Sequence, residues 1–366
     1  MAKPKILIAD DVAENIDVLM GALGGRYAVV AAKEGEKALA MARLEPRPDM
    51  ILLDVMMPKM DGYEVCRQLK ADPDTAGIPV LFITALGGYE EESKGLALGA
   101  LDYITKPFQP DLVKARVANH LELKRHRDRL EELVAERTRE LALTRDVTIF
   151  TLANLAEARD PETGGHIRRT QTYVRLLAEK LCEQPRFAAE LDAYAIELLH
   201  KSAPLHDVGK VGVPDAILLK PGKLTDEEFE EIKKHTTYGR DALAAGVREL
   251  GENSFLGYAM EIAYTHHEKW DGSGYPQGLK GEEIPLAGRL MAIADVYDAL
   301  ISKRVYKPPF PHAKAVSIIR EGRGSHFDPA LVDAFLEINE RFRETAIRFA
   351  DFDEERQVLS AVEPLS

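Results

Sequence analysis

The sequence lacks the features that mark secreted, membrane-embedded and nucleic-acid-binding proteins. Its 366 residues include only two cysteines, Cys66 and Cys182, so no disulfide framework is needed and a reducing compartment is expected. No apolar run approaches the roughly 20 residues that span a bilayer, and the N-terminus has no signal-peptide pattern. The net charge of −13 argues against a broad surface for nucleic acid or anionic lipid. We therefore expect a cytoplasmic protein with no membrane insertion and no nucleic-acid partner.

Glycine and proline are absent from residues 121–154, and this stretch is rich in Arg, Glu and Leu. Leu123, Leu130, Val134 and Leu141 recur at spacings of seven, four and seven, which is typical of a helix with an apolar stripe. Two interpretations are open: a short parallel coiled coil between two copies of the chain, or a single helix packed on its own domain. The length of the chain allows two domains joined by such a connector.

The residues before this helix alternate short apolar runs with helical patterns. Five runs predict strands, at residues 5–9, 27–31, 50–53, 80–83 and 102–104. Apolar strands that alternate with helices favour a doubly wound α/β fold whose five-stranded parallel sheet is covered on both faces. Ligands of such sheets bind at the carboxyl ends of the strands. The chemically versatile residues Asp10, Asp11, Asp54, Thr84 and Lys106 all fall at those ends.

Three carboxylates at one sheet edge repel one another unless a cation joins them. A hard ion such as Mg²⁺ prefers oxygen ligands and brings phosphate-containing partners with it. An Asp carboxylate beside Mg²⁺ is a competent nucleophile toward an activated phosphoryl group, and a Lys and a Thr hydroxyl can hold the phosphoryl oxygens. Any one of these Asp residues is equally well explained as a turn former, but the combination favours a phosphoryl-accepting site.

Residues 1 to about 122 resemble a response-regulator receiver domain, because LLDVMMPKMDGYEVC surrounds Asp54 and the motifs ITA and YITKP follow. The resemblance implies that Asp54 accepts a phosphoryl group and that a sensor histidine kinase is the partner. It also implies that Asp10, Asp11 and the main-chain carbonyl of Met56 bind Mg²⁺. Thr84 and Lys106 would contact the phosphoryl group, and Tyr103 would be the aromatic switch residue.

Strand patterns are missing after residue 150, where helical patterns alternate with the loops PETGG, KPGKLT and WDGSGYP. Thr225, with Glu228 three residues later, predicts a helix start closed by a capping box. From about Arg348 the sequence is charged and acidic, so we expect a frayed or poorly ordered tail. The predicted divisions are an α/β domain, a helical linker, an all-helical domain and a tail: residues 1–122, 123–148, 149–345 and 346–366.

Histidines and carboxylates recur through the helical part in combinations that suit metal ions. Imidazole together with carboxylate favours Fe, Mn or Zn over Ca or Mg. Each residue alone is more simply explained as a hydrogen-bonded polar residue, but the adjacent pairs and the Asp within an apolar helix change the balance. The candidate ligands exceed what one ion uses, so two or three ions would share them: Glu162, His166, His206, Asp207, His235, His266, His267 and Asp295.

Such a centre suits the cleavage of a phosphodiester. The reaction needs a strong nucleophile at neutral pH and positive charge beside the phosphate oxygens. Two metals about 3.5–4 Å apart provide both, with a metal-bound hydroxide attacking in line. Lys210 lies three residues beyond Asp207 and can neutralise the charge that develops on the phosphoryl group.

Residues of about 146 to 345 resemble the HD-GYP subgroup of HD-domain phosphohydrolases, on the motifs LHDVGKVGVPDAILLKPGKLT and HHEKWDGSGYPQGLKGEEIP. The resemblance implies an all-helical fold and hydrolysis of cyclic di-GMP to pGpG, GMP or both. It assigns the eight candidate ligands to two or three Fe or Mn ions. Glu162 keeps a three-metal site open, because members without the equivalent carboxylate hold two metals.

The same resemblance assigns substrate contacts. It places Tyr275 against a guanine or phosphate, and Arg304 and Lys307 on phosphate; the alternatives are a tight turn at WDGSGYP and a solvated basic loop. Lys210 is a further substrate contact, and Asp298 is expected to help protonate the leaving oxygen.

We therefore expect a response regulator in which phosphorylation of Asp54 controls a cyclic di-GMP phosphodiesterase, as a homodimer formed through the linker helix. One alternative is a catalytically weak effector that binds cyclic di-GMP and signals through protein contacts. Another is a hydrolase of a different cyclic dinucleotide.

Overall fold

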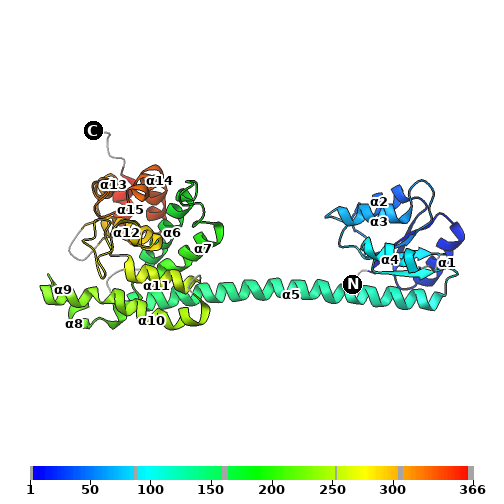
Figure 1. Ribbon diagram of the computed structural model, residues 1–366, viewed down its shortest axis with the longest axis horizontal. Coiled ribbons are helices and arrows are strands. Elements are labelled where there is room, and N and C mark those ends of the chain that lie inside the picture. The colour runs from blue at the N-terminus through cyan, green and yellow to red at the C-terminus, as the bar shows by residue number, and fades with distance from the viewer. Residues whose placement is uncertain (1–2, 86–88, 159–163, 252–253, 304–307, 362–366) are drawn as a thin grey trace. The chain divides into compact units, whose positions relative to one another are not determined.

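The computed structural model describes residues 3–85, 89–158, 164–251, 254–303 and 308–361. The chain divides into two compact units, Met1–Arg139 and Glu140–Ser366. The 48-residue helix α5 (Pro110–Glu157) contributes residues to both units (Figure 1). The predicted long helix is confirmed, and it starts earlier than expected because the last helix of the first unit continues into it without a break.

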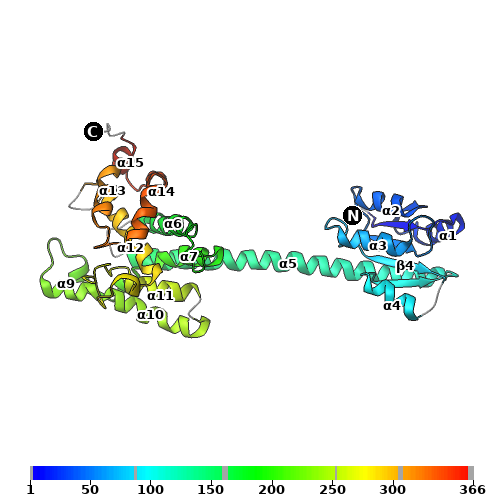
Figure 2. The same cartoon turned by 45° about the horizontal axis from the view of Figure 1, so that its top comes forward.

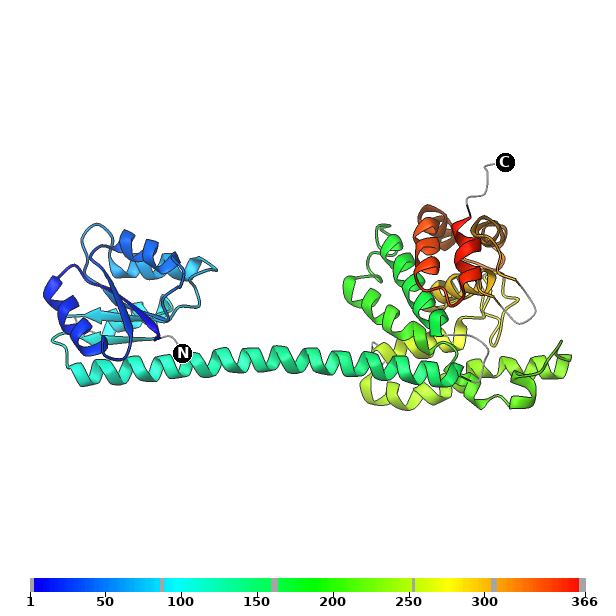
Figure 3. The same cartoon turned by 180° about the vertical axis from the view of Figure 1, so that it is seen from behind.

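The first unit contains a five-stranded parallel sheet, as predicted, with the strand order β2-β1-β3-β4-β5. Figure 3 shows the strands between layers of helices. The strands are β1 (Lys5–Ala9), β2 (Ala28–Ala32), β3 (Met50–Asp54), β4 (Val80–Thr84) and β5 (Asp102–Thr105). The helices that precede α5 are α1 (Ala13–Leu23), α2 (Gly35–Arg43), α3 (Gly62–Ala71) and α4 (Tyr89–Ala97).

Successive strand residues point to opposite faces of this sheet, and the central strands β1, β3 and β4 are almost entirely apolar and buried because both of their faces are covered. Leu53 and Phe82 join one core with Val65 of α3. Leu52 and Val113 of α5 belong to the core on the other face. Asp10 and Asp11 follow β1 directly and Asp54 ends β3, so these acidic residues lie together at the carboxyl edge of the sheet.

The second unit is helical, and no strand occurs in the part of it that the structure describes. Its elements after α5 are α6 (Gly164–Leu181), α7 (Ala193–Ser202), η1 (Ala203–Leu205), η2 (Val208–Gly212), α8 (Asp215–Leu218), α9 (Asp226–Lys233), α10 (His235–Leu250), α11 (Phe255–Thr265), η3 (Gly281–Glu283), α12 (Leu286–Ile301), α13 (His312–Glu321), α14 (Pro329–Arg348) and α15 (Asp353–Ser360). The predicted capping box is confirmed at α9, where the Thr225 N–H donates to Glu228 Oε2 over 2.7 Å and the Glu228 N–H donates to Thr225 Oγ1 over 3.3 Å.

The largest core of the second unit lies among α6, α12 and α14. Tyr173 stacks on Phe342 with ring centroids 4.4 Å apart, and Tyr297 meets both rings edge-on. A separate group of helices, α10, α11 and η2, packs together beside this core (Figure 2). The metal-binding residue types lie on the elements of both groups, so the packing of the helices sets the geometry of the site.

The expectation of a frayed tail after Arg348 is wrong for the described residues 349–360. Helix α15 buries Leu359 and Glu355. The Glu355 carboxylate accepts hydrogen bonds from the main-chain N–H groups of Lys303 (2.8 Å) and Asp351 (3.0 Å). Composition misled the prediction, because a buried acidic residue that accepts main-chain hydrogen bonds looks like a solvated one in the sequence.

The apolar stripe of α5 does not pack on its own domain. Leu123, Leu130, Val134 and Leu141 are 64%, 61%, 64% and 71% exposed. Packing on its own domain therefore does not account for this stripe, although Leu121 and Ile149, on either side of it, are buried. Among the described residues, no helix is both long enough and apolar enough to cross a membrane.

Candidate functional site

The carboxyl edge of the first unit's sheet carries an acidic pocket that also contains the ammonium group of Lys106. Asp10 and Asp54 are buried, and Lys106 Nζ lies 3.0 Å from Asp10 Oδ2 and 2.8 Å from Asp54 Oδ2. Asp10, Asp11 and Asp54 each offer an oxygen, and these three oxygens lie within 4.8 Å of one another. Burial and the nearby Asp10 charge raise the pKa of Asp54, although Lys106 opposes them. This arrangement suits a divalent cation with oxygen ligands.

The remaining residues expected at this pocket surround it. Thr84 is buried at the end of β4, and its carbonyl accepts a 2.8 Å hydrogen bond from the Lys106 main chain. The Met56 N–H donates to Asp54 Oδ1 over 3.3 Å, and the Met56 side chain is exposed. Tyr103 is half-buried on β5, with the guanidinium of Arg116 5.6 Å from its ring centroid. The fold thus brings Asp10, Asp11, Asp54 and Lys106 together, while Thr84, Met56 and Tyr103 lie on the neighbouring strands and loop.

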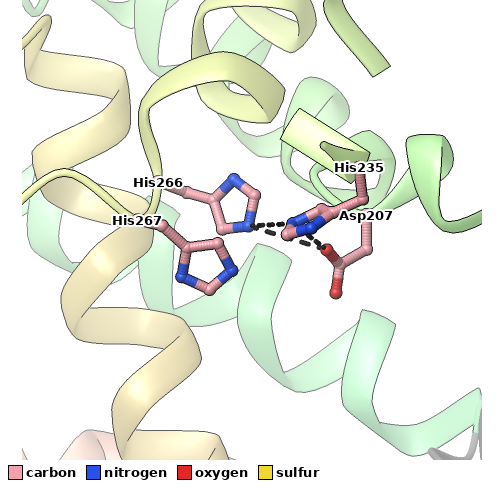
Figure 4. Close-up of side chains that lie close together, drawn as sticks. All are labelled: Asp207, His235, His266 and His267. Atoms are coloured by element: carbon pink, nitrogen blue, oxygen red, sulfur yellow. Dashed lines mark hydrogen bonds and ion pairs between the residues drawn. The ribbon is translucent and has the colours of Figure 1, made fainter. Parts of the chain in front are cut away.

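A second cluster lies where η2, α10 and the end of α11 meet in the second unit. Asp207, His235, His266 and His267 each offer one ligand atom, and these atoms lie within 4.8 Å of one another. Figure 4 shows the His235 and His266 rings converging on the Asp207 carboxylate. Asp207 Oδ1 lies 3.3 Å from His235 Nε2 and 3.6 Å from His266 Nε2, while Lys210 Nζ lies 2.8 Å from Oδ2. Burial would raise the pKa of Asp207, but Lys210 and His206 hold it well below its usual range.

The main chain fixes which ring nitrogen of these histidines faces the cluster. The Nδ1 atoms of His206, His235 and His266 lie 3.0, 2.7 and 2.9 Å from the carbonyl oxygens of Ala203, Ile232 and Ile262. A carbonyl only accepts, so each Nδ1 carries the proton and each Nε2 presents a lone pair. Burial lowers the pKa of His235 to about 4, which keeps it neutral. This is the hydrogen-bonding pattern of metal-ligating histidines.

An orphaned oxygen supports the same conclusion. Among the described side chains, Asp207 Oδ1 is buried and has no hydrogen-bond donor. It faces nitrogen lone pairs, and this contact is unfavourable unless a cation lies between them. The residues present therefore fit a divalent metal with nitrogen and oxygen ligands.

A third cluster adjoins the second one, on α5, α6 and the end of η1. Glu157, His166 and His206 each offer a ligand atom within 4.8 Å of the others. His166 Nε2 lies 3.2 Å from His206 Nε2 and 4.0 Å from Asp295 Oδ1. Asp295 therefore lies beside this group, as the sequence predicts, while Glu157 is a member that the sequence did not predict.

Asp298 contacts the Nδ1 side of the His166 ring, opposite the Nε2 atom that faces the cluster. Its Oδ2 is 2.8 Å from His166 Nδ1, and the buried Arg169 guanidinium donates to both carboxylate oxygens over 2.6 and 2.9 Å. Burial would raise the pKa of Asp298, but Arg169 and His166 hold it well below its usual range. A buried, ionised carboxylate has no proton to give, so the expected role in protonating the leaving oxygen does not fit. Its position suits the orientation of His166 instead.

The loop that carries Tyr275 folds over the second cluster. The Tyr275 ring lies 4.8 Å from the His267 ring at 30°, and its N–H donates to the His267 carbonyl over 3.2 Å. The buried carboxylate of Glu268 accepts the N–H groups of Gln277 (2.8 Å) and Leu279 (3.1 Å). Glu268 thus holds the far end of the loop by hydrogen bonds. In the sequence it directly follows the candidate ligands His266 and His267, and this position could have indicated a role at the site.

Two glycines allow these close approaches. A Cβ atom at Gly209 would lie 1.9 Å from the His235 carbonyl oxygen, so η2 can meet α10 only with glycine there. A Cβ atom at Gly274 would lie 2.3 Å from the Lys269 nitrogen, within the Tyr275 loop. The glycines of both sequence motifs therefore serve packing around the cluster.

Three expected site residues, Glu162, Arg304 and Lys307, lie outside the described residues. Of the residues that the sequence did not predict, Arg169 carries a weak signal, since it lies three positions after His166 on the same helical face. Glu157 carries none, because nine positions separate it from His166 and no helical period links the two.

Family models match both parts of the chain. A response regulator receiver domain matches residues 6–118, and an HD domain matches residues 150–331.

Several curated proteins are similar to this chain over half of its length or more. A "Probable cyclic di-GMP phosphodiesterase" of Vibrio cholerae is 49% identical over 94% of this chain and 80% of its own length. The cyclic di-GMP phosphodiesterase response regulator RpfG of Xanthomonas campestris pv. campestris is 37% identical over 79% of this chain and 75% of its own length. A 3'3'-cGAMP-specific phosphodiesterase of Vibrio cholerae is 44% identical over 52% of this chain and 34% of its own length.

Proposed function

Because the chain belongs to the response regulators that join a receiver domain to an HD phosphodiesterase domain, we propose that it hydrolyses cyclic di-GMP under the control of Asp54 phosphorylation. The single observation that carries this proposal is the Asp207 cluster. Its histidine lone pairs converge on a buried carboxylate oxygen that has no hydrogen-bond donor. Such a cluster has a use in a metal-dependent hydrolase and none in a plain helical bundle.

The HD domain binds divalent metal, and its two His and carboxylate clusters are the residues that would hold it. We propose two or three Fe or Mn ions, since neutral imidazole with carboxylate favours these metals over Mg or Ca. Bound there, the ions supply positive charge beside the scissile phosphate and lower the pKa of water. Glu162 is a further proposed ligand, although it lies outside the described residues.

The chain's own residues then orient the substrate and balance its charge. Lys210 holds Asp207 in place and adds positive charge where negative charge develops on the phosphate. Tyr275, stacked on His267, presents a ring edge and a hydroxyl for a guanine or phosphate. Arg304 and Lys307 are proposed to contact phosphate. Asp298 orients His166 and does not donate a proton.

The receiver pocket supplies the control. We propose that Mg²⁺ joins Asp10, Asp11 and the Met56 carbonyl, and that a sensor histidine kinase is the source of the phosphoryl group on Asp54. A phosphoryl group on Asp54 competes for Lys106, which now contacts the Asp54 carboxylate directly. Thr84, at the end of β4, and Tyr103, on the neighbouring strand β5, then carry the change onward.

The exposed stripe of α5 supports a parallel homodimer. Leucine and valine side chains spaced by seven and four residues form the seam of a coiled coil, and such a seam is costly to leave in water. The double variant Leu130→Glu with Val134→Glu should convert a dimer to a monomer in light scattering. The exposed Glu136→Gln on the same helix is the matched control. A wild-type monomer, or a double variant that remains dimeric, would refute this interface.

The experiment that tests the function is turnover by the purified chain. Cyclic di-GMP and the hybrid 3'3'-cGAMP would be incubated side by side under anaerobic Fe²⁺ and, separately, Mn²⁺, with and without a small-molecule phosphoryl donor. Chromatography should show pGpG or GMP from cyclic di-GMP only with metal, and a rate that changes with the donor. Preferred cleavage of the hybrid nucleotide would identify 3'3'-cGAMP, and not cyclic di-GMP, as the substrate. Tight binding of cyclic di-GMP without turnover would favour the effector alternative.

A further inference from the structure

Glu157 is the last residue of α5, and its side chain ends in the metal-binding region of the second unit. It is 3% exposed. Glu157 Oε1 lies 3.8 Å from His166 Nε2, and one atom each of Glu157, His166 and His206 lie within 4.8 Å of one another. The Glu157 carboxylate therefore lies within reach of two imidazole nitrogens that could share a metal ion with it.

The two histidines beside Glu157 are prepared as ligands. The His166 Nδ1 is engaged by Asp298 over 2.8 Å, and the His206 Nδ1 by the Ala203 carbonyl over 3.0 Å. Both therefore turn their Nε2 atoms inward, where the two atoms are 3.2 Å apart. Two Nε2 atoms and a carboxylate oxygen that converge in this way match the ligand types of a divalent metal site.

The packing of α5 ties Glu157 to both histidines. Ala153 and Ile149, one and two turns before Glu157, share a core with Ile167 and Leu205. Ile167 directly follows His166, and Leu205 directly precedes His206. A displacement of α5 against this core would therefore move the carboxylate relative to the two imidazoles.

We propose that Glu157 is itself a metal ligand, completing a site with His166 and His206 beside the Asp207 cluster. The last residue of the connecting helix would then bind the metal. A displacement of α5 would alter the metal affinity of this site, and metal binding would in turn stabilise one position of α5. This inference rests on the proposed function, because it assigns a further residue to the same centre.

The test compares the full-length wild type with Glu157→Gln, and with Glu136→Gln as the control on an exposed position of the same helix. Metal-free protein would be titrated with Mn²⁺ alone, and bound metal counted by elemental analysis. Glu157→Gln should bind one Mn²⁺ fewer per chain, or bind it at least about tenfold more weakly. Glu136→Gln should match the wild type. Unchanged stoichiometry and affinity in Glu157→Gln would overturn the proposal.

Two further readouts keep the outcome specific. If Glu157 were only structural, Glu157→Gln would lower the melting temperature of the metal-free chain as much as that of the Mn²⁺-loaded chain, and this result would also overturn the proposal. A ligand role predicts a loss confined to the loaded chain. A wild type that binds no Mn²⁺ would refute the proposed function, whereas a metal-binding, active wild type matched by Glu157→Gln would refute only this inference.

Discussion

Replacing Glu268 by glutamine should loosen the loop that holds Tyr275 while leaving the metal ligands in place. The carboxylate accepts the N–H groups of Gln277 and Leu279 over 2.8 and 3.1 Å. In Glu268→Gln one of the two oxygens becomes an NH₂ group, which cannot accept. At least one loop N–H then loses its acceptor and faces another donor.

The magnitude follows from this loss. A buried donor left without an acceptor costs about 1–3 kcal/mol, which corresponds to roughly 5- to 150-fold in the equilibrium between closed and open loop. We expect kcat/KM for cyclic di-GMP to fall within that range, mainly through KM, because Tyr275 is no longer held on His267. Metal content should not change, since His235 and His266 are fixed by carbonyls outside this loop.

The assay is steady-state turnover under Mn²⁺, paired with elemental analysis of the same samples. Glu282→Gln is the matched control, because Glu282 lies nearby on η3 and its side chain is 71% exposed. A kcat/KM within twofold of the wild type would refute the role of Glu268 in the loop. A loss of metal in proportion to the loss of rate would show that Glu268 supports the ligands instead.

Three more predictions follow from the same geometry. Asp298→Asn should weaken Mn²⁺ binding by about 10- to 100-fold, because His166 loses the carboxylate that orients it; unaltered affinity in a metal titration would contradict that role. Asp54→Asn should abolish any effect of a small-molecule phosphoryl donor on turnover, and a donor effect that persists would move the control elsewhere. Chelation should lower the melting temperature of the second unit, since metal at 100 times its Kd stabilises by about 2.7 kcal/mol, or about 5–11 °C for a unit of this size; equal melting with and without chelator would argue against a bound metal.

The sequence allowed the receiver fold to be predicted because local pattern and global fold agree there. The central strands β1, β3 and β4 are mostly apolar, and each ends in a polar residue or is followed directly by one, so the parallel sheet and the pocket of Asp10, Asp54 and Lys106 follow from one pattern. Helix α5 was also predicted, since it lacks glycine and proline over many turns.

The second unit was harder because its site depends on contacts between distant helices. The motifs that carry His206, Asp207, His266 and His267 predicted a metal centre, and the fold brings these residues together. Glu157 was missed because its approach to His166 depends on how α5 packs against α6.

Burial explains the remaining errors. Asp298 was expected to donate a proton, but the buried Arg169 holds it ionised. Glu355 looked like part of a solvated tail, but it accepts main-chain hydrogen bonds inside the unit. Sequence gives the charge of a residue directly, whereas its partners become known only from the fold.

Turnover of cyclic di-GMP by His206→Ala and Asp207→Ala, beside the wild type, tests the central claim most directly. Both variants remove a group at the junction of the two clusters, where His206 Nε2 lies 3.3 Å from Asp207 Oδ2. The account predicts that each loses at least about 100-fold in rate under saturating Mn²⁺, because the charge stabilisation at the phosphate depends on the metals that these residues hold. Turnover close to that of the wild type in both variants would contradict a metal-dependent phosphodiesterase at this site.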